Sequence, residues 1–168
     1  MKLLTDSDIK KLILCPKMIT DALPRKGMIS DKKSSIIKRK NLKLISQDGQ
    51  YHFEIFMRQN TLLIEQFSIG LQFKSDERSI GNIILIRFNG EHGQSDWSKD
   101  NHYSAFHIHR ITQELLEKGI FEPKETEITS RYCSFDGALN EFLRYVNILN
   151  ISEYFPYSDK QKLLFGEK

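Results

Sequence analysis

A turn signal between two alternating segments constrains the fold of this chain more than any other feature of the sequence. Apolar side chains take alternate positions in residues 42–46 and again in residues 51–57. Successive side chains of a β-strand point to opposite faces, so this alternation indicates two strands that each have an apolar face. Asp48-Gly49 lies between them, and both residue types tolerate the positive φ of a tight hairpin turn. The sequence therefore predicts an antiparallel hairpin.

Other periodic segments predict the remaining strands and two helices. Strands are expected at residues 61–67, 83–86 and 105–110, and an edge strand is expected within 122–129. The apolar run 83–86 is typical of a central strand covered on both faces. Residues 5–14 and 134–148 have apolar side chains at helical spacing. We therefore predict a single α+β domain, a mainly antiparallel sheet with an N-terminal helix and a C-terminal amphipathic helix packed on it.

The basic side chains are concentrated in the N-terminal quarter. Residues 1–44 contain 12 of the 25 Lys and Arg but 4 of the 22 Asp and Glu, so this part has an excess of eight positive charges. Its weak periodicity, with Pro24 and Gly27, predicts a loop or arm over 17–39. The domain of residues 1–168 thus divides into a basic helix and arm, 1–40, and a sheet-plus-helix body, 41–168. Such an arm suits nucleic acid or an acidic protein surface, and the residues predicted to bind nucleic acid are Lys32, Lys33, Lys38, Arg39 and Lys40.

Composition indicates a folded protein that stays out of membranes. Hydrophobic residues make up 39% of the chain, and no apolar run approaches the roughly 20 residues of a membrane span. Asp6 and Asp8 follow the first residues at once, which leaves no apolar segment for a secretory signal. Cys15 and Cys133 stand alone in the sequence, a usage typical of reduced thiols in the cytoplasm. We therefore expect a cytoplasmic protein.

A histidine cluster is the candidate site. The chain has five His, and His102, His107 and His109 fall within eight residues. His107 and His109 are two positions apart in a predicted strand, so their imidazoles should lie on one face. Imidazole exchanges protons near neutral pH, so such a pair suits acid–base chemistry. No Gly-rich phosphate loop, GxSxG elbow or HExxH helix occurs, which argues against several common enzyme classes.

Three interpretations of the cluster remain open. In the first, His107 and His109 cleave RNA as a general acid and base without a metal or other cofactor, supported by His102 and by Arg110. Strict alternation places Arg110 on the opposite face, and Arg87 on the preceding strand is a substitute. In the second, the pair binds a transition metal, with further ligands drawn from His92, Asp96, Asp100 and His102. In the third, the imidazoles form ordinary hydrogen bonds and the protein acts by binding another macromolecule.

The order of these segments resembles a family of small bacterial and phage proteins known as a domain of unknown function. The segments that carry the resemblance are residues 4–6, 15–17, 44–49, 84–90, 106–109 and 142–148. The last two are more distantly similar to TumE-type toxins of toxin-antitoxin pairs, which join a His-x-His strand to a Phe-Leu-rich helix. This resemblance implies a growth-inhibiting, nuclease-like protein neutralised by a cognate antitoxin, with His107 and His109 as the residues carried over.

These observations predict an RNA-directed, toxin-like protein, with metal-independent endoribonuclease activity as its expected reaction. The alternative is a non-enzymatic bacterial or phage protein that inhibits a host system by binding an acidic protein or nucleic-acid surface. The expected partners are therefore RNA and either a cognate antitoxin or a host protein.

Overall fold

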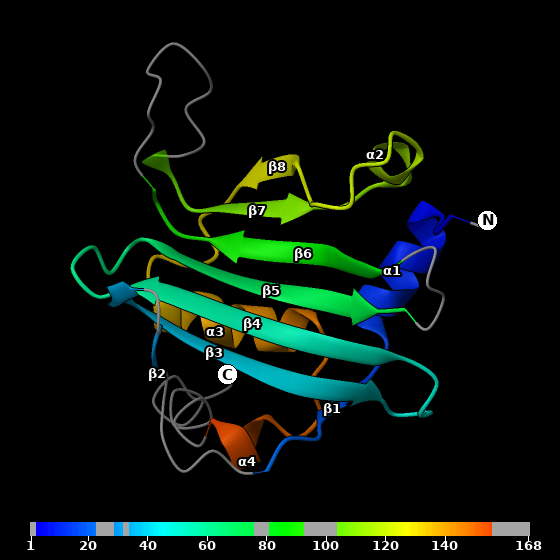
Figure 1. Cartoon of the computed structure of the whole chain (residues 1–168), viewed down its shortest axis with the longest axis horizontal. Coiled ribbons are helices and arrows are strands. Elements are labelled where there is room, and N and C mark those ends of the chain that lie inside the picture. Colours follow the sequence, from blue (N-terminus) through cyan, green and yellow to red (C-terminus); the bar gives the residue numbers. More distant parts are fainter. Residues whose placement is uncertain (1–2, 23–28, 32–33, 76–80, 93–103, 156–168) are drawn as a thin grey trace, which may run out of the picture.

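An antiparallel sheet extends through the part of the chain that the computed structural model describes, residues 3–22, 29–31, 34–75, 81–92 and 104–155. Its strands follow the order β1-β3-β4-β5-β6-β7-β8, and β2 also pairs with β3 (Figure 1). This arrangement confirms the predicted α+β class and the antiparallel sheet. The elements are α1 (Asp6–Leu14), β1 (Lys17–Ile19), β2 (Ile29–Asp31), β3 (Ser34–Ser46), β4 (His52–Asn60), β5 (Phe67–Lys74), β6 (Asn82–Asn89), β7 (His107–Arg110), α2 (Gln113–Glu117), β8 (Glu125–Ile128), α3 (Phe135–Tyr145) and α4 (Ile151–Tyr154).

The predicted hairpin is formed by β3 and β4. Gly49 has a φ of 76° in the turn, a conformation that glycine adopts without the strain of a side chain. Leu44 lies opposite Phe53 and Leu42 lies opposite Ile55, and all four side chains are buried. The two-residue period therefore places the apolar side chains of both strands in one core.

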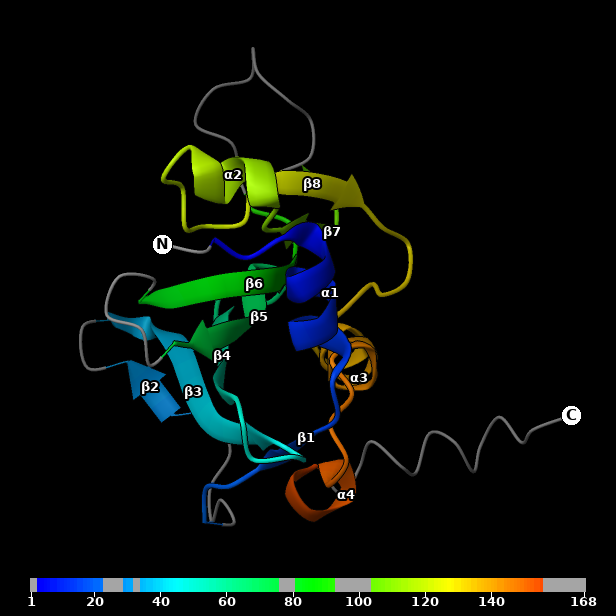
Figure 2. The ribbon, with the colours of Figure 1, turned by 90° about the vertical axis from the view of Figure 1, so that its right-hand side faces the viewer.

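Helices α1 and α3 cover one face of this sheet (Figure 2). The Ser134 side chain accepts a hydrogen bond from the Gly137 N–H and caps α3, whose Phe142 and Leu143 are fully buried. We call the opposite side of the sheet the open face, because no described helix packs across it (Figure 1). None of the described helices is long and apolar enough to cross a bilayer.

The segment 17–39, predicted as a loop or arm, contributes strands to the sheet instead. Met18 of β1 lies opposite Ile45 of β3, and β2 pairs with the first half of β3. That half continues the ladder with β4, where Lys38 lies opposite Gln59. Strand pairing is a tertiary interaction, so it overrides the weak local pattern of this lysine-rich segment.

The strand predicted at 61–67 is a turn for most of its length. Strand β4 continues to Asn60, and the Asn60 Oδ1 accepts hydrogen bonds from the N–H groups of Leu62 and Leu63. An asparagine that bonds to the backbone two residues later favours a turn over an extended strand. Leu62, Leu63 and Ile64 are consequently exposed by 74%, 52% and 59%.

A β-bulge in β6 allows two consecutive residues of its apolar run, Leu85 and Ile86, to be fully buried. Leu71 of β5 lies opposite Ile86, whereas the next residue, Gln72, lies opposite Ile84, so Leu85 is the extra residue. The strand lies between β5 and β7, as expected for a central strand. The run was predicted to be covered on both faces, but Ile84 is only partly buried and lines a pocket on the open face.

Lys17 joins the ends of two helices beneath the sheet. Its side chain is fully buried, and its Nζ donates hydrogen bonds to the carbonyls of Ile13, Cys15 and Val146 at 2.7, 2.8 and 3.1 Å. Burial lowers the pKa of Lys17 to about 8. These carbonyls lie at the C-terminal ends of α1 and α3, where backbone acceptors lack helical partners. Lys17 therefore holds both helices in position against the sheet.

Substitution of Lys17 with Met should destabilise the fold by about 2–4 kcal/mol, because two buried carbonyls and one partly buried carbonyl lose their donor. Urea unfolding followed by circular dichroism measures this change. Lys11→Met, on the exposed side of α1, is the matched control and should change the free energy of unfolding by less than about 0.5 kcal/mol. Equal stability of the two variants would contradict the role given to Lys17.

Candidate functional site

The structure places His107 and His109 side by side on the open face of β7. Ile108 between them points into the helix-covered core and is fully buried. The two imidazole centroids are 4.8 Å apart, and the rings meet edge to face at 86°. His107 is fully buried and His109 is 6% exposed.

Hydrogen bonds identify the protonated nitrogen of each neutral ring. The His107 Nδ1 lies 2.8 Å from the Ala105 carbonyl, which only accepts, so Nδ1 carries the hydrogen. The Thr126 hydroxyl donates to the Lys124 carbonyl at 3.1 Å. The same hydroxyl therefore accepts from the His109 Nδ1 at 3.1 Å. In both neutral rings Nε2 is thus the nitrogen with the lone pair, the atom that accepts a proton in base catalysis.

Strands β5 and β6 place polar side chains next to the two imidazoles. Arg87 is the register partner of His109, and Asn89 is the register partner of His107. Ser68 of β5 lies opposite Asn89. Side chains directly opposite on one face of a sheet have Cβ atoms about 4.5–5.5 Å apart. The open face therefore presents a serine, an amide, a guanidinium and two imidazoles on three adjacent strands.

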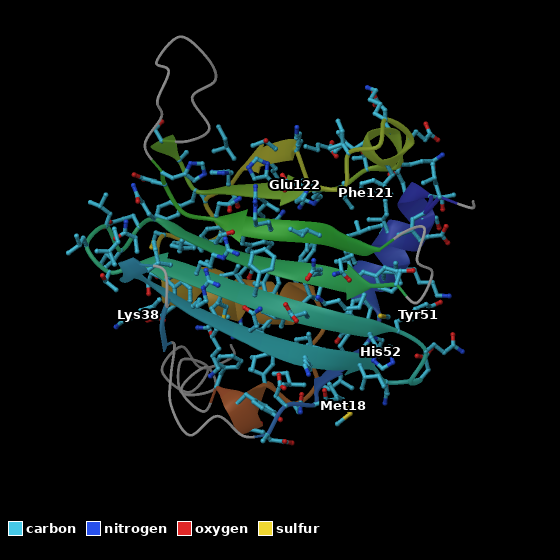
Figure 3. All side chains as sticks on the ribbon, in the orientation of Figure 1. Met18, Lys38, Tyr51, His52, Phe121 and Glu122 are labelled. Carbon is cyan, nitrogen blue, oxygen red and sulfur yellow. The ribbon has the colours of Figure 1, made fainter. Side chains whose placement is uncertain are left out.

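A pocket of about 520 Å³ lies over these strands. His92, which follows β6, lines it, and the His92 ring centroid is 5.1 Å from that of His107. His92, His107 and His109 thus form a continuous row of rings that we call the imidazole row. The lining consists of Asn41, Glu54, Phe56, Arg58, Phe67, Ser68, Gln72, Ile84, Arg87, Asn89, His92 and Glu122. Figure 3 shows Glu122 next to β7.

The Asn89 Nδ2 and the Ser68 Oγ, both in this lining, have no hydrogen-bond partner among the described residues. Asn89 is only 3% exposed. An amide donor that is buried without a partner destabilises the fold by about 1–3 kcal/mol. Such a group in a pocket lining is well placed to bind an acceptor atom of a ligand. The side chains of Ser68, Arg87 and Asn89 are all of types that donate hydrogen bonds, and we call these three residues the donor cluster.

The backbone beneath the site is held from the other side of the sheet. The Tyr132 hydroxyl donates to the carbonyls of Asn89 and His107 at 3.1 and 2.8 Å, and burial raises the pKa of Tyr132, which keeps it a donor. A Cβ at Gly90 would lie 1.7 Å from the Glu65 carbonyl oxygen. Only glycine therefore allows the chain to leave β6 at this point and reach His92.

The other predicted site residues do not join this cluster. Arg110 lies on the helix-covered side, where it pairs with Glu127 and lines a separate pocket of about 410 Å³ that α1 also lines. Lys38 and Lys40 alternate with Arg39 along β3, so they do not share its face. Figure 3 shows Lys38 at the end of the sheet distant from β7, and burial lowers the pKa of Lys40. His102, Lys32 and Lys33 lie outside the described residues.

The sequence did not reveal two members of the site, Ser68 and Asn89. An Asn-Gly pair such as Asn89-Gly90 is typical of a turn that ends a strand, so it gives no sign of a binding role. Their place beside His107 depends on strand register, which local sequence patterns do not determine. Within the described residues, no group of three or more His, Cys, Asp or Glu side chains is arranged to hold a metal ion. Asp96, Asp100 and His102, the other predicted metal ligands, are not among these residues.

The Nδ1–H tautomer is expected for both His107 and His109 when the rings are neutral. Two-bond nitrogen–proton NMR correlations on imidazole-labelled protein distinguish the tautomers. Thr126→Val removes the acceptor of His109, so this ring alone should shift toward the Nε2–H tautomer. An Nε2–H tautomer at His107 in the wild-type chain would contradict the hydrogen bonding described above.

Two buried asparagines should respond in opposite ways to substitution by leucine. The Asn150 side chain accepts from the Ile19 N–H and donates to the Ile19 carbonyl, so Asn150→Leu should destabilise the fold by about 2–3 kcal/mol. Asn89→Leu removes an unpartnered amide, and its free energy of unfolding should stay within about 1 kcal/mol of wild type or rise. Urea unfolding measures the free energy of unfolding of both variants. A larger loss of this free energy in Asn89→Leu than in Asn150→Leu would contradict this description.

The open-face pocket thus combines hydrogen-bond donors, a guanidinium and the imidazole row. Arginine and neutral donors together suit an oxyanion such as a phosphate ester, and adjacent imidazoles supply proton transfer. Comparison of the chain with protein-family models, with curated proteins and with solved structures gives no match in any of the three.

Proposed function

We propose that the open face binds RNA and that the imidazole row cleaves it by acid–base catalysis. The observation that carries this proposal is the donor cluster of Ser68, Arg87 and Asn89, which we call the phosphate subsite from here on. In it a buried amide donor without a partner among the described residues lies beside Arg87 and His107. A phosphodiester supplies acceptor oxygens for these donors. It also supplies, in RNA, a neighbouring 2′-hydroxyl whose proton an imidazole accepts.

The reaction is transfer of the phosphoryl group to the adjacent 2′-oxygen. A neutral imidazole of the row takes the proton of the 2′-hydroxyl, and the 2′-oxygen forms a bond to phosphorus. The bond from phosphorus to the 5′-oxygen breaks, and a protonated imidazole gives its proton to that oxygen. The products are a 2′,3′-cyclic phosphate and a 5′-hydroxyl end, and Arg87 stabilises the charge that accumulates on the phosphate oxygens.

His92 extends the pair predicted from the sequence. Its ring lines the pocket, whereas the rings of His107 and His109 lie behind the lining. We therefore assign to His92 the proton transfer in direct contact with the RNA. The second of the two proton transfers is assigned to His107 and His109. A cognate antitoxin that neutralises the chain would, in this proposal, cover the pocket.

Cleavage of RNA oligonucleotides by the purified chain tests the proposal. The wild type should generate 2′,3′-cyclic phosphate ends in the presence of a metal chelator, with a bell-shaped dependence on pH, because one imidazole must be neutral and another protonated. His107→Ala combined with His109→Ala should lower the rate about 10²–10⁴-fold. His52→Ala is the matched control, since His52 is exposed at the far end of β4 (Figure 3) and should retain the wild-type rate.

Thermal unfolding of each variant shows whether it is folded at the assay temperature. Asn89→Leu provides a second test that does not remove an imidazole, and it should weaken RNA binding at unchanged stability. Wild-type rates in both the double histidine variant and Asn89→Leu would overturn the proposal.

An interaction protein is the second candidate, favoured by the exposed apolar turn at Leu62, Leu63 and Ile64. Exposed apolar side chains in one cluster are typical of protein-binding surfaces. Expression in a bacterial host separates the two functions. Growth arrest that persists in the double histidine variant but is lost in Leu62→Ser with Leu63→Ser would favour the interaction function. Growth arrest that is lost in the double histidine variant but persists in the double serine variant would favour cleavage.

A further inference from the structure

The pocket continues past the phosphate subsite to three side chains that the proposed reaction does not use, Glu54, Phe56 and Gln72. We propose that these three form a nucleobase subsite that selects guanine over adenine. This inference rests on the proposed binding of RNA to the open face and adds the identity of the base that precedes the cleaved bond.

Phe56 provides a flat apolar surface within a polar pocket. Its ring lies across β5 above Gly70, in space that only a glycine leaves open. A Cβ at Gly70 would lie only 2.3 Å from the Phe56 Cζ. The guanidinium of Arg58 lies 5.9 Å from the ring centroid. Here the guanidinium lies over the ring, and aromatic rings and guanidinium planes on an open sheet face are both common stacking partners of an unpaired base.

Glu54 is held in position to contact the edge of a base on this platform. The Glu54 Oε1 accepts from the Asn41 Nδ2 at 2.9 Å, and its Oε2 lies 3.6 Å from the Lys74 Nζ. Lys74 also donates to the Gln72 Oε1 at 2.8 Å, so the amide nitrogen of Gln72 is the end that turns away from this lysine. Each carboxylate oxygen accepts more than one hydrogen bond, and Glu54 therefore keeps acceptor capacity for a ligand.

The hydrogen-bonding edge of guanine matches this arrangement and that of adenine does not. Guanine presents two adjacent N–H donors, which pair with a carboxylate, and a carbonyl, which accepts from the Gln72 amide or from Lys74. Adenine presents a ring nitrogen acceptor at the corresponding position. A carboxylate facing that lone pair is repelled and also loses a hydrogen bond, so the subsite discriminates against adenine.

The spacing along the sheet fits a single nucleotide. Gly70 lies opposite both Phe56 and Arg87, and the pair Glu54 and Gln72 is the next same-face position along β4 and β5. Two residues of a strand span about 7 Å. A base above Phe56 therefore has Glu54 at its edge on one side and the phosphate subsite on the other.

Isothermal titration of the full chain with 3′-GMP and 3′-AMP tests this inference. The wild type should bind 3′-GMP at least tenfold more tightly than 3′-AMP. Glu54→Gln should bring the two dissociation constants within about twofold of each other, while Glu65→Gln, an exposed carboxylate in the β4–β5 turn, should keep the preference. Phe56→Leu should weaken both nucleotides about tenfold.

The outcomes distinguish this inference from the proposed function. Binding of both nucleotides with equal affinity by the wild type would overturn the guanine subsite and leave RNA binding in place. Binding of neither nucleotide would overturn RNA binding itself. A preference for guanine that survives Glu54→Gln in a variant with wild-type thermal stability would overturn the role of this carboxylate.

Discussion

Within the described part of the chain, α1 and α3 pack on one face of the sheet and no helix packs across the other, and this arrangement determines the rest of the structure. Each strand sends alternate side chains to opposite faces, so the face under α1 and α3 takes most of the apolar positions. The open face takes most of the polar ones, with Phe56 and Ile84 as apolar exceptions. In β7 this separation places Ile108 in the core and His107 and His109 opposite it. Polar groups from neighbouring strands then become adjacent through backbone pairing alone, which gives a rigid site.

Some buried polar side chains stabilise this fold, and the Asn89 amide does not. Tyr132 fixes the backbone of β6 and β7 beneath the site, and Lys17 fixes the helices that support the sheet. The Asn89 amide does neither, since its Nδ2 has no partner among the described residues. A polar group retained at a cost in stability is expected at functional sites more than elsewhere, and this distinction separates the open-face pocket from the ordinary polar surface.

Local patterns predicted the parts of the fold that depend on local chemistry. The Asp48-Gly49 turn and the helix that begins after Ser134 follow from turn and capping preferences. The loop predicted at residues 17–39 was wrong because strand pairing outweighed the weak local pattern. The strand predicted at residues 61–67 was wrong because the Asn60 side chain stabilises a turn there. Strand period alone placed the two imidazoles on one face. The neighbours of those imidazoles depend on register and on the β6 bulge, which involve residues far apart in sequence.

The open face, and not the helix-covered side, is the proposed binding surface for a phosphate-bearing ligand. Backbone amide NMR of the full chain, titrated with a dinucleotide whose first sugar is deoxyribose and therefore lacks the attacking hydroxyl, distinguishes the two sides. The largest shifts are expected at Ser68, Arg87 and Asn89, with the amides of α1 and α3 unchanged. The largest shifts along α1 and α3, or no shifts in the presence of excess dinucleotide, would contradict this proposal.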